Sequence, residues 1–392
     1  MPRYKYLIIG GGMTADAAVR GIREVDPEGA IGLIAEEAVP PYKRPPLTKG
    51  LWKGEAFEEI WLKTEELGVE IRGERRVRTV DPAGKRVVDE AGAEYTFEKL
   101  LLATGGTPRR LPFGGDEVIY YRTVRDYERL RGMTAEGREF AVIGGGFIGS
   151  EIAAGLAMTR AEVTMMFPDE IIGTRVFPRD LARFVTGYYR DKGVRVLPND
   201  SAVGIEVRAG KNILKTRNQA ELAVDGVVAG IGIEPNVELA KASGLALDNG
   251  IVVDELLRTS APDIYAAGDV ASFFNPALGK RIRVEHEDNA NTMGRSAGRS
   301  MAGRGEPYHH LPFFYSDLFE LGYEAVGETD PRHEVFADWK DPNREGVLYY
   351  LEKGRVRGVL LWNVWNQVEA ARRLIAEPGP FRSEDLKGRL PE

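Results

Sequence analysis

Two glycine-rich turns hold the residue types and spacing best suited to binding a phosphate-containing ligand. The first, GGGMTA over 10–15, lies between an apolar strand and an alanine-rich helix expected over 16–24. Gly10 permits a sharp turn, Gly12 lets the backbone approach a pyrophosphate, and Ala15 lets helix and strand pack closely. Because the N–H groups of the helix N-terminus would face the phosphates, the pattern predicts a dinucleotide site. A glycine turn in an ordinary α/β unit is the alternative.

The second turn, GGGFIG over 144–149, has the same surroundings: a strand expected over 140–143 and a helix expected over 150–159. A glycine motif flanked twice by strand and helix is much stronger evidence than one such motif. The two turns predict two similar domains, each binding one dinucleotide. In the first domain Glu36 and Glu37 end the next apolar run, where a carboxylate is expected to bind a ribose hydroxyl.

Two residues of opposite charge follow the corresponding strand of the second domain, expected over 163–167. Asp169 is the first carboxylate there, and Arg175 comes six residues later. An acid at this place binds a free 2′-hydroxyl, whereas a nearby arginine accommodates a 2′-phosphate. The sequence therefore favours NADH and leaves NADPH open.

Three further stretches are candidates for ligand contacts. The loop over 40–49 combines four prolines with three cations, so it is expected to be extended and basic, either beside a pyrophosphate or simply solvated. The apolar runs before Gly105 and before Asp269 read as strands that end at a glycine turn. Asp269 would reach a ribityl hydroxyl or cap the segment that follows it.

Composition excludes several kinds of chemistry. The 392 residues contain no cysteine and four histidines, which removes disulfides, thiolate metal sites and redox-active cysteine pairs, and no metal site is expected. A net charge of −7 gives no support to nucleic-acid binding. No run of eighteen apolar residues exists, and the first strand starts too early for a leader peptide. The expectation is a cytoplasmic protein without a membrane span.

The rest of the chain supplies the elements that position these residues. Short strands are expected over 69–72, 76–80, 86–89, 94–97, 202–207, 213–216 and 222–228. A core-facing helix is predicted by apolar residues at helical spacing, namely Leu181, Phe184, Val185, Tyr188 and Tyr189. Near the C-terminus, 346–361 reads as a hairpin that turns at 352–354, and 367–376 reads as a short helix.

These stretches together resemble the FAD- and NAD(H)-dependent ferredoxin reductases. The resemblance rests on the two glycine motifs and on YKRPPLTK over 42–49, ATGG over 103–106, GIEPN over 232–236 and AGD over 267–269. A narrower likeness to the apoptosis-inducing-factor group rests on RVEHEDNA over 283–290, GRSAG over 294–298, FYSDL over 314–318, GYEA over 322–325 and LWN over 361–363. The motifs follow the family's order along nearly the whole chain.

The resemblance implies an α/β fold with two Rossmann-like dinucleotide-binding domains and an α+β C-terminal domain. The FAD domain would take residues 1–112 and resume over 246–307, with the NAD(H) domain, 113–245, inserted in it. The C-terminal domain would take 308–392. A homodimer is left open.

The family's cofactor contacts are carried over position by position. Those implied for FAD are Gly10, Gly11, Gly12, Met13, Thr14, Ala15, Glu36, Glu37, Arg44, Lys49, Val77, Ala103, Thr104, Gly105, Arg122, Gly268, Asp269, His286 and Glu287. Those implied for the nicotinamide cofactor are Gly145, Gly146, Phe147, Ile148, Asp169, Arg175, Gly232 and Glu285. Glu287 is a departure, because apoptosis-inducing factor has a second histidine at this position.

The resemblance also implies roles at the reacting end of the cofactors. Lys49 and Glu151 would pair beside the flavin, with a surface ion pair as the plainer alternative. Phe147 would gate the flavin, with core packing as its alternative. Tyr315 stands where the family often has a tryptophan near the nicotinamide and the flavin. The C-terminal domain is expected to form the wall of the flavin site with its aromatic residues, namely Phe313, Phe314, Tyr315, Trp362 and Trp365. Most of these are expected to be core, and Tyr315 is the one expected to reach the flavin.

These features predict an NADH-dependent flavin oxidoreductase, in which a hydride passes from NADH to FAD. Because the chain has no cysteine, the electrons must leave directly from the flavin to a bound acceptor. A small ferredoxin- or rubredoxin-like carrier protein is the acceptor we expect. The alternatives are a quinone or oxygen reductase, and a slow redox sensor or assembly factor, which the likeness to apoptosis-inducing factor supports.

Overall fold

The chain folds into two compact units in the computed structural model, which describes residues 1–390. The first unit contains Met1–Lys43, Glu58–Thr107 and Glu234–Pro312. The second unit contains Arg44–Phe57, Pro108–Ile233 and the chain from Phe313 onward. These two units are defined by contacts between residues, whereas the three domains expected from the sequence are defined by the ligand or role of each. The expected domain boundaries therefore stay predictions.

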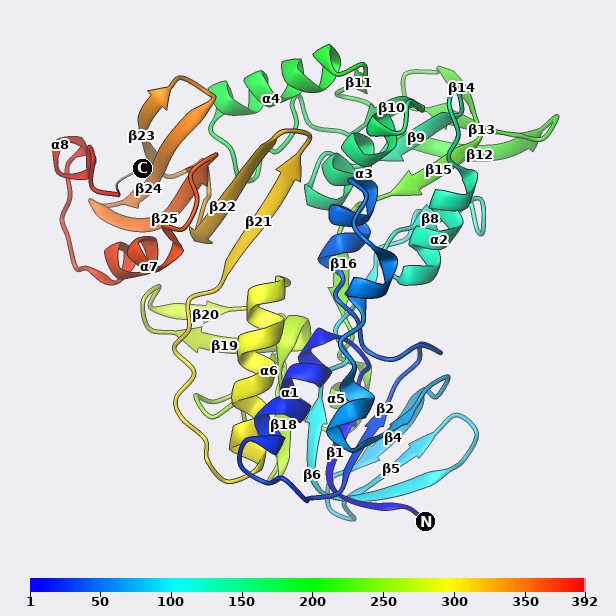
Figure 1. Ribbon diagram of the computed structural model, residues 1–392, viewed down its shortest axis with the longest axis vertical. Helices are drawn as coiled ribbons and strands as arrows, with labels where there is room; N and C mark the ends of the chain where they lie inside the picture. Colours follow the sequence, from blue (N-terminus) through cyan, green and yellow to red (C-terminus); the bar gives the residue numbers. More distant parts are fainter. Residues whose placement is uncertain (391–392) are drawn as a thin grey trace. The chain divides into compact units, whose positions relative to one another are not determined.

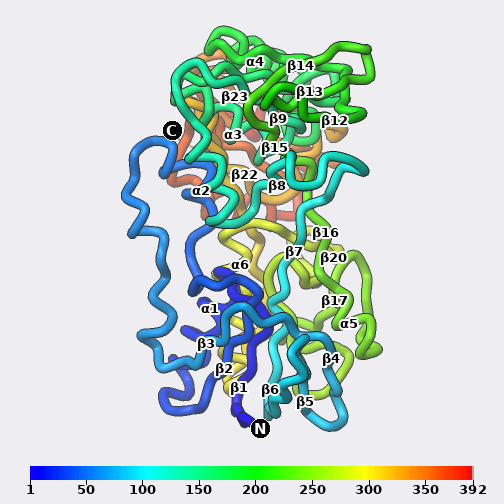
Figure 2. Tube along the Cα trace, turned by 90° about the vertical axis from the view of Figure 1, so that its right-hand side faces the viewer, coloured from blue at the N-terminus to red at the C-terminus, as the bar shows by residue number. Residues whose placement is uncertain are grey.

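A seven-stranded sheet forms the centre of the first unit. Its strands are β1 (Arg3–Ile9), β2 (Ile31–Ile34), β3 (Val69–Arg72), β4 (Val77–Asp81), β5 (Arg86–Asp89), β6 (Glu94–Leu102) and β18 (Ile264–Ala266). Figure 2 shows them in the order β3-β2-β1-β6-β5-β4, and β18 pairs with the end of β6. β1 pairs in parallel with β2 and β6, and its apolar residues are buried. A continuous apolar run is typical of a parallel strand covered on both faces.

Two helices of the first unit, α1 (Met13–Arg23) and α6 (Glu287–Met301), lie side by side against this sheet (Figure 1). A Cβ on Gly298 would lie 2.1 Å from the Ala18 carbonyl oxygen, and one on Gly294 would lie 2.4 Å from that of Thr14. Glycine at these positions therefore lets the two helix backbones touch. The smaller elements of this unit are α5 (Glu238–Ala242), β17 (Ile251–Val252), β19 (Ala271–Asn275) and β20 (Lys280–Ile282).

The second unit contains a five-stranded parallel sheet and a three-stranded antiparallel sheet. The parallel sheet consists, in spatial order, of β11 (Arg195–Leu197), β10 (Glu162–Met166), β9 (Glu139–Ile143), β15 (Gly226–Ala229) and β8 (Val118–Tyr120). The antiparallel sheet consists of β12 (Ala202–Arg208), β13 (Lys211–Thr216) and β14 (Glu221–Val224). The helices beside them are α2 (Val124–Met133), α3 (Phe147–Met158) and α4 (Arg179–Asp191). The predicted apolar stripe of α4 is buried, apart from Phe184, which is half-buried.

A five-stranded antiparallel sheet completes the second unit. In spatial order it consists of β21 (Phe313–Leu318), β22 (Leu321–Gly327), β25 (Arg355–Trp362), β24 (Glu345–Glu352) and β23 (Glu334–Asp341). The predicted hairpin turn at 352–354 is confirmed, because it connects β24 to β25. The predicted C-terminal helix is α7 (Val368–Ala376), and a shorter helix, α8 (Ser383–Leu386), follows it. β7 (Gly106–Pro108) and β16 (Ile233–Pro235) form a separate two-stranded ladder.

Two expectations about local structure are wrong. The proline-rich loop is not extended, since Pro45–Leu47 and Gly50–Trp52 form short 3₁₀ helices. The fixed φ of proline, about −65°, suits a 3₁₀ helix as well as extended chain. The strand expected over 222–228 is two strands, β14 and β15, which are separated at Asp225. The Asp225 carboxylate accepts a hydrogen bond of 2.9 Å from the backbone N–H of Glu139, so the chain passes there from one sheet to the next.

Candidate functional site

The first glycine turn has the backbone geometry that its sequence predicts. Gly10 has a φ of +125°, and a Cβ on it would lie 2.1 Å from the Ala103 carbonyl oxygen, so only glycine fits. Gly12 begins α1 without any side-chain cap. The N-terminus of α1 thus presents backbone N–H groups and the positive end of the helix dipole, which is the arrangement that binds a phosphate.

Several predicted flavin positions of the first unit meet at this turn. A Cβ on Gly268 would lie 2.3 Å from the Thr14 hydroxyl, so the turn before Asp269 packs directly on the start of α1. Ala103 and Thr104 follow β6 beside Gly10, and the Thr104 hydroxyl donates to the Asn236 carbonyl oxygen at 2.8 Å. The structure therefore brings three predicted turns, which are far apart in the sequence, to the same edge of the sheet.

The two acids after β2 have different partners. Glu36 is exposed and lies 3.3 Å from Arg76, whereas Glu37 accepts a hydrogen bond of 2.6 Å from the Tyr42 hydroxyl. Both follow the second strand, as a ribose-binding acid should. Val77 is buried in the core of this unit, so its side chain is not open to a ligand.

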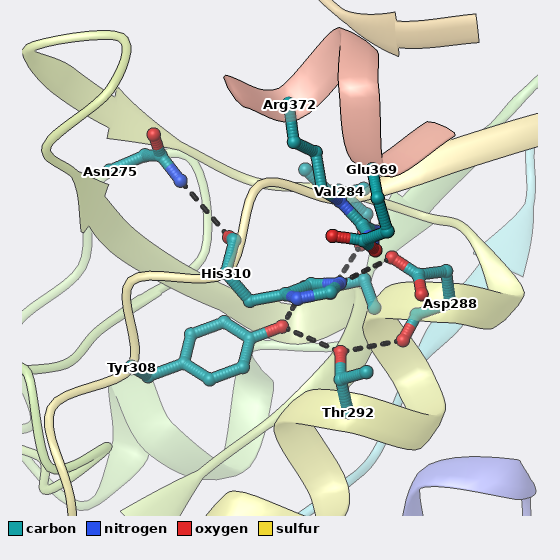
Figure 3. A network of polar contacts seen from close by, with 9 residues as sticks. Asn275, Val284, Asp288, Thr292, Tyr308, His310, Glu369 and Arg372 are labelled. Carbon is teal, nitrogen blue, oxygen red and sulfur yellow. Dashed lines mark hydrogen bonds and ion pairs between the residues drawn. The ribbon is translucent and has the colours of Figure 1, made fainter. Parts of the chain in front are cut away.

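The start of α6 carries the predicted residues Glu285, His286 and Glu287. His286 is the residue immediately before the helix, and Glu285 pairs with Arg283 at 2.6 Å. Figure 3 shows how the chain after α6 returns to its first turns: His310 Nε2 lies 2.6 Å from the Asp288 carboxylate, and the Tyr308 and Thr292 hydroxyls lie 2.9 Å apart. These contacts fix the first turns of α6, and with them the segment before the helix.

The second glycine turn belongs to the second unit and repeats the geometry of the first. Gly144 has a φ of +122°, and a Cβ on it would lie 2.3 Å from the Gly230 carbonyl oxygen. A Cβ on Gly145 would lie 2.8 Å from the Phe167 ring. Gly146 is different, because no atom of the described chain would come within 4 Å of its Cβ. The space that a Cβ on Gly146 would occupy, at the start of α3, is therefore open.

The loop that follows β10 lies against this turn. Gly173 lies between the predicted residues Asp169 and Arg175 in the sequence. Its N–H donates to the Gly145 carbonyl oxygen at 3.1 Å. Both side chains are exposed. The structure thus places both candidates for recognition of the 2′-position on the loop next to the second turn. Gly232 has a φ of +95° and accepts a hydrogen bond from the Arg109 N–H at 2.9 Å.

Lys49 and Glu151 form an ion pair inside the second unit. Lys49 Nζ lies 2.8 Å from Glu151 Oε1, and the two side chains are 12% and 2% exposed. The alternative of a surface ion pair is therefore wrong. The predicted flavin positions Arg44 and Arg122 also meet in this unit, since the Arg44 guanidinium donates to the Arg122 carbonyl oxygen at 2.8 Å. A catalytic role for the ion pair stays a prediction.

Two residues that sequence reasoning missed complete the surroundings of Glu151. The Ser316 hydroxyl donates to Oε1 at 2.6 Å, and the Thr48 hydroxyl donates to Oε2 at 2.5 Å. We call Glu151, Lys49, Thr48 and Ser316 the Glu151 network. Thr48 and Ser316 lie next to Lys49 and Tyr315 in motifs already recognised, but only the fold shows that they meet.

Two buried tyrosines pack near the Glu151 network. Burial raises the pKa of the Tyr189 and Tyr323 hydroxyls well above the usual value, and the negative charge of Glu151 adds to both shifts. Tyr323 lies opposite Ser316 in the ladder of β21 and β22. Both hydroxyls therefore stay neutral, and that of Tyr189 donates to the Ser150 carbonyl oxygen at 2.9 Å.

The predicted aromatic residues divide between core and surface. Trp362 is completely buried, but Phe313, Phe314 and Tyr315 are half-buried and Trp365 is 45% exposed, so the expectation that most would be core is wrong. Phe313, Phe314 and Tyr315 belong to β21, the edge strand that pairs with β22, and Trp365 follows the end of β25. Lys49 Nζ lies 5.1 Å from the centre of the Tyr315 ring.

Phe147, the predicted gate, is 38% exposed and packs edge-on against Phe314, with ring centroids 4.9 Å apart. Core packing is therefore not its environment, and its role as a gate stays a prediction. Among residues 1–390 no group of acids and histidines is placed to hold a metal ion. In the same part of the chain no helix is long and apolar enough to cross a membrane.

The chain thus contains two strand–glycine–helix units, each with a helix N-terminus that no side chain caps. A pair of such units is typical of reductases that use two dinucleotides. The family model described as pyridine nucleotide-disulphide oxidoreductase matches residues 4–294. The chain belongs to this family. The model for the C-terminal part of apoptosis-inducing factor, mitochondrion-associated, matches residues 334–377.

Three similar proteins narrow the group. The putative apoptosis-inducing factor 1, mitochondrial, of Drosophila melanogaster is 33% identical over 94% of this chain, which spans only 63% of that protein's length. The 5,5'-dehydrodivanillate O-demethylase ferredoxin reductase subunit of Sphingobium sp. is 33% identical over 91% of this chain and 89% of its own. Putidaredoxin reductase, solved in a covalent complex with putidaredoxin, is 28% identical with a TM-score of 0.90 over 97% of this chain and 94% of its own.

These similarities confirm the predicted fold class, with two Rossmann-like sheets and an antiparallel C-terminal domain. They also confirm that the chain is an NAD(P)H-dependent flavin oxidoreductase of the ferredoxin reductase and apoptosis-inducing-factor group. The family binds FAD and NAD(P)H in general.

Proposed function

We propose that this chain binds one FAD, accepts a hydride from NADH, and passes electrons one at a time to a small ferredoxin- or rubredoxin-like protein. The observation that carries the proposal is that a member of a disulphide oxidoreductase family has no cysteine. Reduction of a disulfide needs a thiolate to attack it. Since the chain has none, the electrons must leave from the flavin itself.

The cofactors supply hydride and electron transfer when they are bound, and the protein supplies position and charge. In the first unit the N-terminus of α1 would hold the FAD pyrophosphate, and Glu36 or Glu37 would accept a ribose hydroxyl. In the second unit the N-terminus of α3 would hold the NADH pyrophosphate. Lys49 would place a positive charge, held by Glu151, beside the reacting flavin.

The purified protein should be yellow and contain one non-covalent FAD per chain. The tight turn at Gly10, the uncapped start of α1 and the adjoining turn at Gly268 support this expectation. The measurement is the visible spectrum together with FAD released on denaturation. A colourless protein that also takes up no FAD on reconstitution would contradict it.

NADH should reduce the flavin faster than NADPH does. Asp169 supports this preference because a carboxylate repels a 2′-phosphate, whereas Arg175 opposes it. Flavin reduction by each reductant, followed by stopped-flow absorbance, measures the preference. Arg175→Ala should raise it, and Asp169→Ala should lower it. Equal or faster reduction by NADPH in the unaltered protein would show that Arg175 determines the site.

The physiological acceptor should be a one-electron protein. Two observations support this choice: a similar protein is named as a ferredoxin reductase subunit, and another was solved with putidaredoxin bound. After reduction with NADH, ferredoxins, rubredoxin, a quinone and oxygen should be offered in turn, and a protein carrier should be reduced fastest.

A redox sensor is the second candidate, and the match of residues 334–377 to the C-terminal part of apoptosis-inducing factor supports it. If oxygen alone reoxidises the protein, and slowly, the reductase proposal fails and the sensor takes its place. The same measurement therefore separates the two functions.

A further inference from the structure

The Glu151 carboxylate is surrounded by three donors from two other segments of the second unit. Lys49 and Ser316 both contact Oε1, at 2.8 and 2.6 Å, and Thr48 contacts Oε2 at 2.5 Å. Glu151, Thr48 and Ser316 are 2%, 7% and 1% exposed. A carboxylate buried this far from water is stable only when hydrogen bonds replace its hydration. The two hydroxyls supply hydrogen bonds that the lysine alone would otherwise have to provide.

Lys49 consequently keeps part of its donor capacity. An ammonium group has three N–H donors. Within the described chain, Lys49 Nζ contacts the Glu151 carboxylate and the face of the Tyr315 ring. The Ser316 hydroxyl donates to Oε1 and the Thr48 hydroxyl donates to Oε2. Because both carboxylate oxygens accept these hydrogen bonds, Glu151 does not need a second N–H from the lysine.

Strand β21 reaches three predicted site residues through three consecutive side chains. Phe314 packs on Phe147, the Tyr315 ring faces Lys49, and the Ser316 hydroxyl binds Glu151. The strand thus contacts both members of the ion pair, while Thr48 holds the carboxylate from the other segment.

We propose that Thr48 and Ser316 are positioning residues, whose hydroxyls fix the Glu151 carboxylate so that Lys49 keeps N–H donors for the reacting ring of the bound flavin. This inference rests on the proposed function. Without either hydroxyl, Glu151 would take a second hydrogen bond from Lys49 and withdraw the ammonium from the ligand.

The test compares Ser316→Ala and Thr48→Val with the unaltered protein. Both variants should lower the midpoint potential of the bound flavin, because a withdrawn ammonium stabilises the reduced, negatively charged flavin less well. Both should also slow its reduction by NADH about tenfold, the effect of losing one hydrogen bond to a charged group. Thr48→Ser, which keeps the hydroxyl, should restore both values.

Thr186→Val is the matched control for a merely structural role. The Thr186 hydroxyl is equally buried in the second unit, donates to the Ala182 carbonyl oxygen at 2.8 Å and accepts from the Ile172 N–H at 3.0 Å. This variant should lose stability without a change in midpoint potential. In a Lys49→Met background, Ser316→Ala should no longer change the potential.

A double-mutant cycle on the free energy of unfolding, with Ser316→Ala and Glu151→Gln in the protein without cofactor, gives a readout that needs no flavin. Coupling between the two changes is expected. Additive losses in this cycle, or an unchanged potential in both single variants, would overturn the inference. A protein that binds no FAD would instead contradict the proposed function, and the cycle would still decide whether the hydroxyl acts on the carboxylate.

Discussion

Replacing Gly146 by valine should strongly slow flavin reduction by NADH and leave the protein folded. The φ of Gly146 is −90°, which a β-branched residue adopts readily, and its Cβ would meet no described atom within 4 Å. The valine would, however, occupy the space over the N-terminus of α3 where the pyrophosphate would lie. We expect the rate of flavin reduction at a fixed low NADH concentration to fall about 100-fold or more, since a displacement of 1 Å has that effect.

Gly144→Ala is the control that separates binding from folding. At this position φ is +122°, and the Cβ would lie 2.3 Å from the Gly230 carbonyl oxygen. The change should therefore lower the free energy of unfolding by about 3 kcal/mol or more. If Gly146→Val is reduced by NADH as fast as the unaltered protein, the nicotinamide cofactor does not bind at this turn.

The glycine turns could be predicted from the sequence because their requirements are local. Gly10 and Gly144 each follow an apolar strand, and each must adopt a positive φ that other residues avoid. A short window of sequence contains the strand, the turn and the start of the helix. The structure then adds the reason why a larger residue fails, namely the carbonyl oxygen of a residue that directly follows a distant strand, Ala103 at the first turn and Gly230 at the second.

The Glu151 network could be predicted only in part. The resemblance to a family pairs Lys49 with Glu151, but no local pattern indicates that the Ser316 and Thr48 hydroxyls bind the same carboxylate. Ser316 is 165 residues from Glu151 in sequence, and its contact depends on the packing of β21 beside α3. The same limit explains the aromatic residues, because the exposure of Trp365 depends on its position after the end of β25 and not on its type.

Lys49→Met and Glu151→Gln should each slow flavin reduction by NADH, and the double variant should be little slower than the worse single one. Loss of one hydrogen-bond donor aimed at the charge that develops in a reaction typically costs about 10²- to 10³-fold in rate. Glu151→Gln acts differently, because it leaves Lys49 as a buried cation without its counter-charge, which costs about 3–5 kcal/mol of stability. Once Lys49 is methionine, that penalty is gone, so the second change should add less than about threefold.

The matched control is a second lysine–carboxylate pair, on the two segments that carry Thr48 and Ser316. Lys53 lies 2.8 Å from Asp317, directly beyond the Glu151 network on both segments, but its side chain is 38% exposed and that of Asp317 is 29% exposed. An exposed pair contributes at most about 1 kcal/mol, so Lys53→Met should change the reduction rate less than about twofold. Stopped-flow reduction of the four variants and the unaltered protein, with unfolding measured alongside, gives the result. Independent, multiplicative losses for Lys49→Met and Glu151→Gln would show that the two buried charges do not act together on hydride transfer.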